Sequence, residues 1–399
     1  MVNLGNFFYT LGMWLQGLLM RAGLSESGAR GVFSALVAAL LPLLALLTAV
    51  PLIWLERKWI ARLQDRMGPN RVGPFGLLQV FADMIKIFTK EDITPLGADR
   101  VVFALAPVLA VAGVLGLWAV IPFAANAFGV DLNVGVLYLV AVGTLSTLAI
   151  MLAGWSANNK YALLGAFRTV AQMISYEVPL VLSLLVPVLL SGSLGLNGIV
   201  GAQREVWFVF SAPLAALLFL IASQAEVSRA PFDLLEAESE IVAGFNIEYS
   251  GMKFGFFFVG EFLHSFTMGL LGATLFLGGW TGPGVEAFPA LGAVYLILKG
   301  TFVYFIFVWA RATFPRIRID QMLDFNWKLL TPLGLFLIPL LAVVNRGLSE
   351  SSLWLRNAAL LGANVLLAVL VLIILGMRGR SARMRAASTV APAPAGSRR

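Results

Sequence analysis

The feature that most constrains this chain is its series of long apolar segments. Nine stretches have, or nearly have, the length of about 20 apolar residues that a helix needs to cross a hydrocarbon layer about 30 Å thick. They are residues 33–55, 101–124, 134–155, 163–190, 207–225, 253–280, 290–310, 329–344 and 357–377. Because backbone polar groups cannot stay unpaired in lipid, we expect these segments to be helices. The sequence therefore predicts an all-α, polytopic membrane helix bundle with about nine transmembrane helices and additional interfacial amphipathic helices.

The composition excludes several classes of protein. Hydrophobic residues make up 59% of the 399 residues and charged residues only 12%, whereas about a quarter of an average soluble domain is charged. This excludes an ordinary water-soluble enzyme. The chain has no cysteine and one histidine, His264, which excludes disulfides and thiolate-bound iron–sulfur or zinc sites. We therefore expect no metal site built by this chain alone.

Some segments are less regular than the rest. Segment 163–190 contains Pro179 and Pro187 and is predicted to be kinked or broken there. Segment 329–344 is short and also contains two prolines. Residues 1–28 are predicted to form an interfacial segment, with an extra short span as the alternative. Residues 378–399 are predicted to be a disordered, basic tail.

The distribution of basic residues predicts the orientation in the membrane. Counted over alternate connections, 21 Lys and Arg lie on one side and 5 on the other. The positive-inside rule then places the loops at 56–100, 226–252 and 311–328 and the C-terminus in the cytoplasm, and the N-terminus outside. We expect a multi-pass protein of the bacterial inner membrane. The net charge of +7 follows from this topology, and no nucleic-acid partner is expected.

The first polar cluster follows the first span and begins with Glu56 and Arg57. Residues 68–74 then supply turn signals that predict a rigid loop. Over residues 75–90 the apolar side chains share one face at about 100° per residue, which predicts an amphipathic helix on the membrane surface. Its polar face carries Gln79, Asp83, Lys86 and Lys90. The helix is either a plain interfacial anchor or one wall of an entrance chamber, and Arg57 and Arg71 are either contacts to lipid headgroups or part of that chamber.

The second polar cluster holds six acids within residues 226–248, where the only basic residue is Arg229. The acids are Glu226, Asp233, Glu236, Glu238, Glu240 and Glu248. At spacings of three and four residues, like charges share a helix face and repel. Repulsion and loss of water both raise carboxyl pKa values, so protons bind and leave near neutral pH. A solvated acidic loop is the alternative, but the interleaved apolar residues favour burial.

Two further carboxylates, Glu177 and Glu261, lie inside predicted spans. A charge at membrane depth costs about 3 kcal/mol or more, so such a group is usually paired, protonated or functional. We interpret both as candidates for a proton relay. His264 shares a helix face with Glu261 and is interpreted as a hydrogen-bonded packing residue, because one His and one Glu do not make a metal site.

Three stretches of the sequence closely resemble one protein family. They are ERK at 56–58 with RMGPNRVGPFGLLQ at 66–79 and ADMIK at 82–86, RAPFDLLEAESEIVAGFNIEYSGMKF at 229–254, and RATFPRIRIDQM at 311–322 with WKLLTPL at 327–333. Together with the order of the spans, the resemblance covers residues 30–345. It is to the H-type membrane subunits of proton-pumping NADH:quinone oxidoreductase, respiratory complex I.

The resemblance implies that the chain is a membrane subunit of that enzyme, inactive alone, which forms part of the quinone chamber and couples quinone reduction to proton translocation. Quinone is then a substrate, and no metal, flavin or iron–sulfur cluster is bound by this chain. The implied partners are lipid and the other subunits of complex I, namely a hydrophilic arm on the cytoplasmic face and antiporter-like membrane subunits.

The resemblance also implies roles for individual residues. The quinone chamber or its entrance would be lined by Glu56, Arg57, Arg71, Asp83, Lys86 and Phe232. A proton path would run through Glu177, Glu226, Asp233, Glu236, Glu238, Glu240 and Glu261. Arg311, Arg316 and Arg318 would brace this path or the docked arm. Two other interpretations stay open from the sequence: the equivalent subunit of a membrane-bound hydrogenase, and a stand-alone transporter or channel without a redox role.

Overall fold

The computed structural model describes residues 7–21, 23, 25–125, 129–235 and 242–390, and their regular structure is helical. Among these described residues, eight helices are long and apolar enough to cross a membrane, which confirms a polytopic helix bundle. They are α2 (Glu26–Leu63), α4 (Arg100–Trp118), α5 (Gly135–Ser156), α6 (Lys160–Ser191), α11 (Gly251–Phe276), α12 (Ala290–Thr313), the continuous run from α13 (Ile319–Phe325) through a π-helical turn (η4, Asn326–Leu330) to α14 (Thr331–Gly347), and α15 (Leu353–Val390).

The ninth predicted span, 207–225, differs from the prediction because it is divided. It consists of α8 (Phe208–Ser211) and α9 (Pro213–Glu226). Ala212 between them has non-helical backbone angles, φ −138° and ψ 60°, and Pro213 has no N–H to continue the hydrogen bonds of α8. Because a residue adds about 1.5 Å to a helix, α9 alone is shorter than the hydrocarbon layer.

Helix α6 continues without a break through Pro179 and Pro187. Pro179 cannot donate to the carbonyl of Ser175 four residues earlier. That carbonyl instead accepts a hydrogen bond of 2.6 Å from Nδ2 of Asn326, in the π-helical turn. A side chain from a neighbouring helix therefore replaces the backbone bond that the proline removes, as is usual for prolines in membrane helices.

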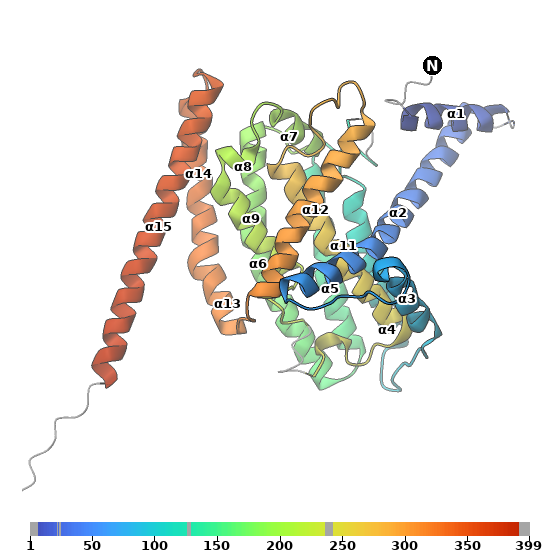
Figure 1. The fold of residues 1–399 in the computed structure, drawn as a ribbon, viewed down its shortest axis with the longest axis horizontal. Coiled ribbons are helices and arrows are strands. Elements are labelled where there is room, and N and C mark those ends of the chain that lie inside the picture. Colours follow the sequence, from blue (N-terminus) through green and yellow to red (C-terminus); the bar gives the residue numbers. More distant parts are fainter. Residues whose placement is uncertain (1–6, 22, 24, 126–128, 236–241, 391–399) are drawn as a thin grey trace, which may run out of the picture.

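Figure 1 shows how the helices are arranged. Helix α11 is the most buried of the long helices and packs against α12 and α4, while α5 and α6 cover the next layer. Helix α2 leaves the bundle on one side, and α14 and α15 lie on the opposite side. Helix α15 is the least buried of the eight.

Short helices occupy the two ends of the bundle. Helix α1 (Phe7–Arg21) lies crosswise at the end of α2 (Figure 1) and is too short to span a bilayer. Helix α3 (Gln79–Thr89), preceded by the turn η2 (Pro74–Gly76), packs against α2 and α11 and exposes Phe81, Ile85 and Phe88. Further short elements among the described residues are α7 (Leu196–Ala202) and η3 (Gly244–Asn246).

The C-terminal segment is more regular than the sequence suggested. Helix α15 continues to Val390, whereas a disordered tail was predicted from residue 378. The sequence from 381 to 387, SARMRAA, is rich in good helix formers, which accounts for the extension. Residues 391–399 lie outside the described residues.

Candidate functional site

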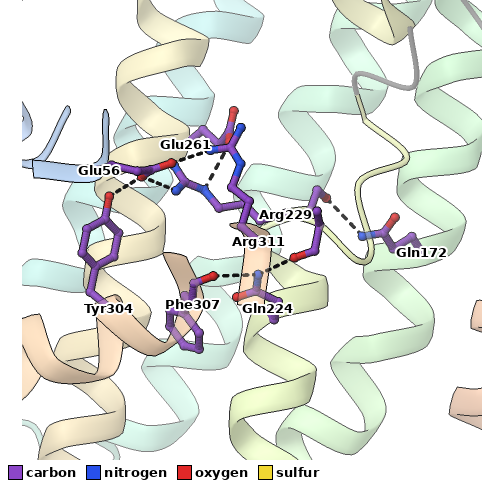
Figure 2. A network of polar contacts seen from close by, with 10 residues as sticks. Glu56, Gln172, Gln224, Arg229, Glu261, Tyr304, Phe307 and Arg311 are labelled. Atoms are coloured by element: carbon purple, nitrogen blue, oxygen red, sulfur yellow. Dashed lines mark hydrogen bonds and ion pairs between the residues drawn. The ribbon is translucent and has the colours of Figure 1, made fainter. Parts of the chain in front are cut away.

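A buried ionic cluster joins α2, α11, α12 and the loop after α9 (Figure 2). Its centre is Glu56, which is 1% exposed. The Glu56 carboxylate accepts hydrogen bonds from Arg229 and from the hydroxyl of Tyr304, and its Oε1 accepts one of 2.5 Å from Nη1 of Arg311. Glu261 completes the set: its Oε1 lies 3.3 Å from Nε of Arg229. We call these five residues the Glu56 cluster.

Arg229 is the residue that links the two carboxylates. It is 1% exposed, and its guanidinium also lies 4.7 Å from the centre of the Phe262 ring. Burial alone would lower the pKa of Arg229, but the neighbouring Glu56 carboxylate holds the pKa above its ordinary value. Arg229 therefore stays charged, and burying it is tolerable only because carboxylates surround it.

Two buried glutamines hold the loop that presents Arg229. Nε2 of Gln172, on α6, donates to the carbonyls of Ala225 and Phe232 at 2.7 and 2.8 Å. Nε2 of Gln224, on α9, donates to the carbonyl of Ala230 at 2.7 Å. These bonds fix the loop on both sides of Arg229 and so hold its guanidinium in place.

An open recess adjoins the Glu56 cluster. It has a volume of about 430 Å³ and lies between α2, α11 and α12. Its lining combines polar and aromatic side chains: Glu56, Arg57, Ile60, Gln64, Arg66, Phe258, Phe262, Arg311 and Ala312. A wide recess with apolar walls and a few charged groups has the character of a binding site for an apolar ligand with a polar head.

Three further cavities lie near the recess, and each shares at least one lining residue with the one before it. The first, which we call the ionic cavity, is a gap too narrow for a water molecule and is lined by Arg229, Asp233, Glu261 and Arg311 among others. The second, the polar cavity, has a volume of about 60 Å³ and includes Glu261, Glu226 and His264 in its lining. The third, the inner cavity, has a volume of about 30 Å³ and is lined by Glu226, Glu177 and apolar residues. Glu261 and Glu226 thus each line two successive cavities.

Comparison with known proteins identifies the family. The family model for NADH dehydrogenase matches residues 35–342. The H-type subunit of NADH-quinone oxidoreductase from Dehalococcoides mccartyi strain 195 is 53% identical over 283 residues, covering 71% of this chain and 78% of that protein. The corresponding protein of Geobacillus kaustophilus is 50% identical over 307 residues, covering 75% and 92%. The chain belongs to the family of H-type subunits of NADH-quinone oxidoreductase.

As a member of this family, the chain is a multi-pass membrane subunit of complex I, and its partners are other subunits of that enzyme. Helix α15 and the first 34 residues lie outside the matched region. The ionic cluster and all the acids that line the cavities lie inside it.

The structure brings together some of the predicted entrance residues and separates others. Arg57 and Asp83 form an ion pair of 2.5 Å that joins α2 to α3. Arg71 and Lys86 are exposed and are not among the residues lining the recess. Phe232 is buried and packs on the ring of Tyr176 at 5.2 Å, so it too lies away from the recess lining.

The predicted acids and bracing arginines also differ in where the structure places them. Asp233 accepts from Arg316 at 2.9 Å and lines the ionic cavity. Arg318 instead pairs with Asp320 at the surface. Glu236, Glu238 and Glu240 lie outside the described residues, so their place in the path stays a prediction.

Sequence reasoning left several members of the site unassigned. Arg229 carried a signal, since it is the only base among six acids. No such sequence signal marked Tyr304, Gln172 or Gln224, because a neutral polar residue in an apolar helix is often only a packing residue. His264 was assigned to packing but lines the polar cavity.

Proposed function

We propose that this chain forms the membrane-side part of the quinone chamber of complex I and couples quinone reduction to proton translocation through its buried carboxylates. The observation that carries this proposal is the succession of acids along adjoining cavities: Asp233 and Glu261, then Glu226, then Glu177. Buried carboxylates in a series of cavities can pass protons or charge through an apolar bundle, which isolated surface acids cannot do.

The open recess is the proposed entrance of the quinone. Its walls offer Phe258, Phe262 and Ile60 to the apolar part of a quinone, and the arginines to its carbonyl oxygens. Helix α3, held to α2 by the Arg57–Asp83 pair and packed against α2 and α11, would lie beside this entrance at the lipid surface. Arg71, Lys86 and Phe232 would then contact lipid, a partner protein or the supporting core.

The electrons must come from another subunit. This chain has no cysteine with which to hold an iron–sulfur cluster. We place the hydrophilic arm with its flavin and clusters on the cytoplasmic face, over the loops at 56–100, 226–252 and 311–328. The antiporter-like subunits would lie on the side of Glu177, the last acid of the series, which lines the inner cavity.

The coupling we propose is electrostatic. Quinone reduction takes up two electrons and two protons, so the charge of the chamber changes transiently. That change shifts the proton affinities of Asp233, Glu261 and the acids at 236–240. One pKa unit corresponds to about 1.4 kcal/mol, whereas moving one charge against 100 mV requires about 2.3 kcal/mol. Several coupled carboxylates are therefore needed, and the cavities provide a series of them.

The test is Glu226→Gln in the assembled complex, with quinone reduction and proton pumping measured in membrane vesicles. Glu226 lines two cavities, so we expect a loss of pumping and a fall in quinone reduction of about tenfold or more. Glu205→Gln, at an exposed position, is the control and should leave both rates unchanged. Wild-type quinone reduction and pumping in Glu226→Gln would show that the path is wrongly placed.

A further inference from the structure

Helix α15 carries two asparagines within its first, otherwise mainly apolar turns. Asn364 is only 1% exposed, although α15 is the least buried of the eight long helices. Asn357 precedes it by seven residues, which is about two helical turns, so the two amides lie on the same face of α15. Polar side chains at membrane depth are costly unless they are paired, so we expect both amides to have partners.

Both asparagines bind Ser211, at the point where the span α8–α9 is divided. Nδ2 of Asn364 donates to the Ser211 carbonyl at 3.1 Å, and the Ser211 hydroxyl donates to Oδ1 of Asn357 at 2.9 Å. Ser211 is the last residue of α8, is 2% exposed, and precedes Ala212, where the backbone leaves the helix. We call Ser211, Asn357 and Asn364 the Ser211 clamp.

The break between α8 and α9 explains why such a contact is needed. The last carbonyls of a helix have no donor within that helix, and an unpaired carbonyl inside a membrane bundle is costly because lipid offers no hydrogen bond. Both N–H groups of the Asn364 amide face carbonyls, one of Ser211 and one of Leu360 on its own helix. Only the donor side of the amide fits between two acceptors, so its neighbours determine its orientation.

The clamp joins α15 to the rest of the bundle. Helix α15 lies at the edge of the molecule (Figure 1) and packs against α14, α8 and α9. Its outward face exposes Val365, Leu366 and Leu372. The helix begins at Leu353, beyond residue 342, where the match to the family model ends. The Ser211 clamp therefore connects a helix outside the matched region to a divided span inside it.

We propose that α15 holds the divided span α8–α9 in place through the Ser211 clamp, and that Asn357 and Asn364 are positioning residues for proton pumping. Helix α9 has only 14 residues and ends at Glu226. Its last turn is bound to α6 by Gln172, whose Nε2 donates to a carbonyl there at 2.7 Å. The clamp fixes the opposite end. The part of the proposal that concerns pumping rests on the proposed function, because the clamp acts through α9.

Hydrogen bonds suit this task better than apolar contacts do. Hydrogen bonds have defined directions, whereas apolar attraction is non-directional and allows packed helices to slide or rotate. The two bonds to Ser211 therefore fix both the height and the rotation of α8, and with them the beginning of α9. A displacement of about 1 Å at a reacting group can cost about a hundredfold in rate, so a loose α9 should impair a step that depends on Glu226.

The experiment compares variants of this chain in the complete complex. Asn364→Leu removes the donor to the Ser211 carbonyl with little change in volume, and Asn364→Gln retains an amide donor and tests rescue. Val365→Leu introduces the same side chain at the next position, which is 52% exposed on the outward face, and is the matched control.

Three quantities are measured for each variant. Hydrogen–deuterium exchange in residues 208–216 of the purified complex reports local opening at the break. The number of protons pumped per quinone reduced, in membrane vesicles, reports positioning. NADH oxidation by a water-soluble acceptor reports assembly independently of the quinone site.

We expect Asn364→Leu to speed exchange in residues 208–216 about tenfold or more, because a buried carbonyl is left unpaired and local opening becomes easier. Exchange in α12, which does not contact the clamp, should stay as in the wild type, whereas a general loss of stability would speed exchange in both. Fewer protons should be pumped per quinone. Asn364→Gln should recover much of both losses, and Val365→Leu should resemble the wild type.

A double-mutant cycle tests the second bond of the clamp. Ser211→Ala and Asn357→Ala each remove one partner of the same hydrogen bond, so each should speed thermal inactivation of the complex. The second substitution should then add little to the first, because residues in direct contact do not contribute independently. Fully additive effects would show that the two side chains do not act as a pair.

Wild-type exchange in residues 208–216 of assembled Asn364→Leu would overturn the clamp. Faster exchange with wild-type pumping would refute the positioning role of the asparagines. If Glu226→Gln is fully active in the same series, the proposed function itself fails, and the exchange data still decide whether the clamp exists. Should Asn364→Leu not assemble, the cycle of Ser211 and Asn357 decides: non-additive effects support the clamp, and additive effects refute it.

Discussion

Arg229 shows how one buried charge can organise a site. A charged side chain in the interior needs close partners of opposite charge, and Arg229 contacts both Glu56 and Glu261. The Glu56 carboxylate accepts hydrogen bonds from three donors: Arg229, the Tyr304 hydroxyl and Arg311. The cluster thereby fixes α2, α11 and α12 at the point where the recess meets the cavities.

We expect Arg229→Gln to destabilise the protein severely, because it leaves a buried carboxylate without its main counter-charge. Breaking a buried ion pair by removing one partner costs about 3–5 kcal/mol. The measurement is the amount of assembled complex in membranes and its temperature of thermal inactivation. Arg30→Gln, which removes an exposed partner of Glu26 on the same helix α2, should change neither quantity. Normal assembly and stability of Arg229→Gln would contradict the role assigned to the cluster.

The sequence singled out individual residues only where burying the charged side chain in the membrane costs free energy. Glu177 and Glu261 were singled out because a carboxylate at membrane depth is usually paired, protonated or functional. The structure places both in the lining of cavities. Tyr304 could not be found, because its partner Glu56 lies 248 residues away in the sequence. Phe232 was assigned to the quinone chamber by resemblance, and this stays a prediction; in the structure its ring packs on Tyr176.

The lengths of the apolar segments predicted the helices, but the sequence did not predict where a helix is interrupted. The two prolines in α6 suggested a kink or a break, yet α6 is continuous through both. At Pro179 the side chain of Asn326 bonds to the carbonyl that the proline leaves without its helical N–H donor. Pro213, in contrast, follows a break at Ala212. The local sequence does not contain the contact at Pro179, because Asn326 lies 151 residues from Ser175.

The contact between α6 and the π-helical turn can be tested by a double-mutant cycle. We expect Asn326→Ala to destabilise the complex by about 1–3 kcal/mol, because the Ser175 carbonyl is left unpaired in the interior. In the background of Pro179→Ala the same substitution should cost less, since the backbone N–H at position 179 can then bond to Ser175. The measurement is thermal inactivation of the four forms. Equal costs in both backgrounds would show that Asn326 does not replace the missing backbone bond.

The described part of the molecule combines eight long helices with the divided segment α8–α9. If α8 and α9 together cross the bilayer, the chain crosses nine times and its termini lie on opposite sides. The bias of basic residues, 21 against 5, then places the C-terminal end of α15 in the cytoplasm and α1 outside. The recess, the Glu56 cluster and the Arg57–Asp83 pair would all face the cytoplasm, where the hydrophilic arm can dock.

The absence of cysteine from the chain makes this topology directly measurable. Ser27→Cys places a thiol at the start of α2, and Ser388→Cys places one near the end of α15. We expect a membrane-impermeant maleimide to label the chain of Ser27→Cys in right-side-out vesicles and that of Ser388→Cys only in inverted vesicles. Wild-type chain from the same vesicles is the control for background labelling. Labelling of both positions from one side would mean an even number of crossings, and α8–α9 would then have to enter and leave the membrane on the same face.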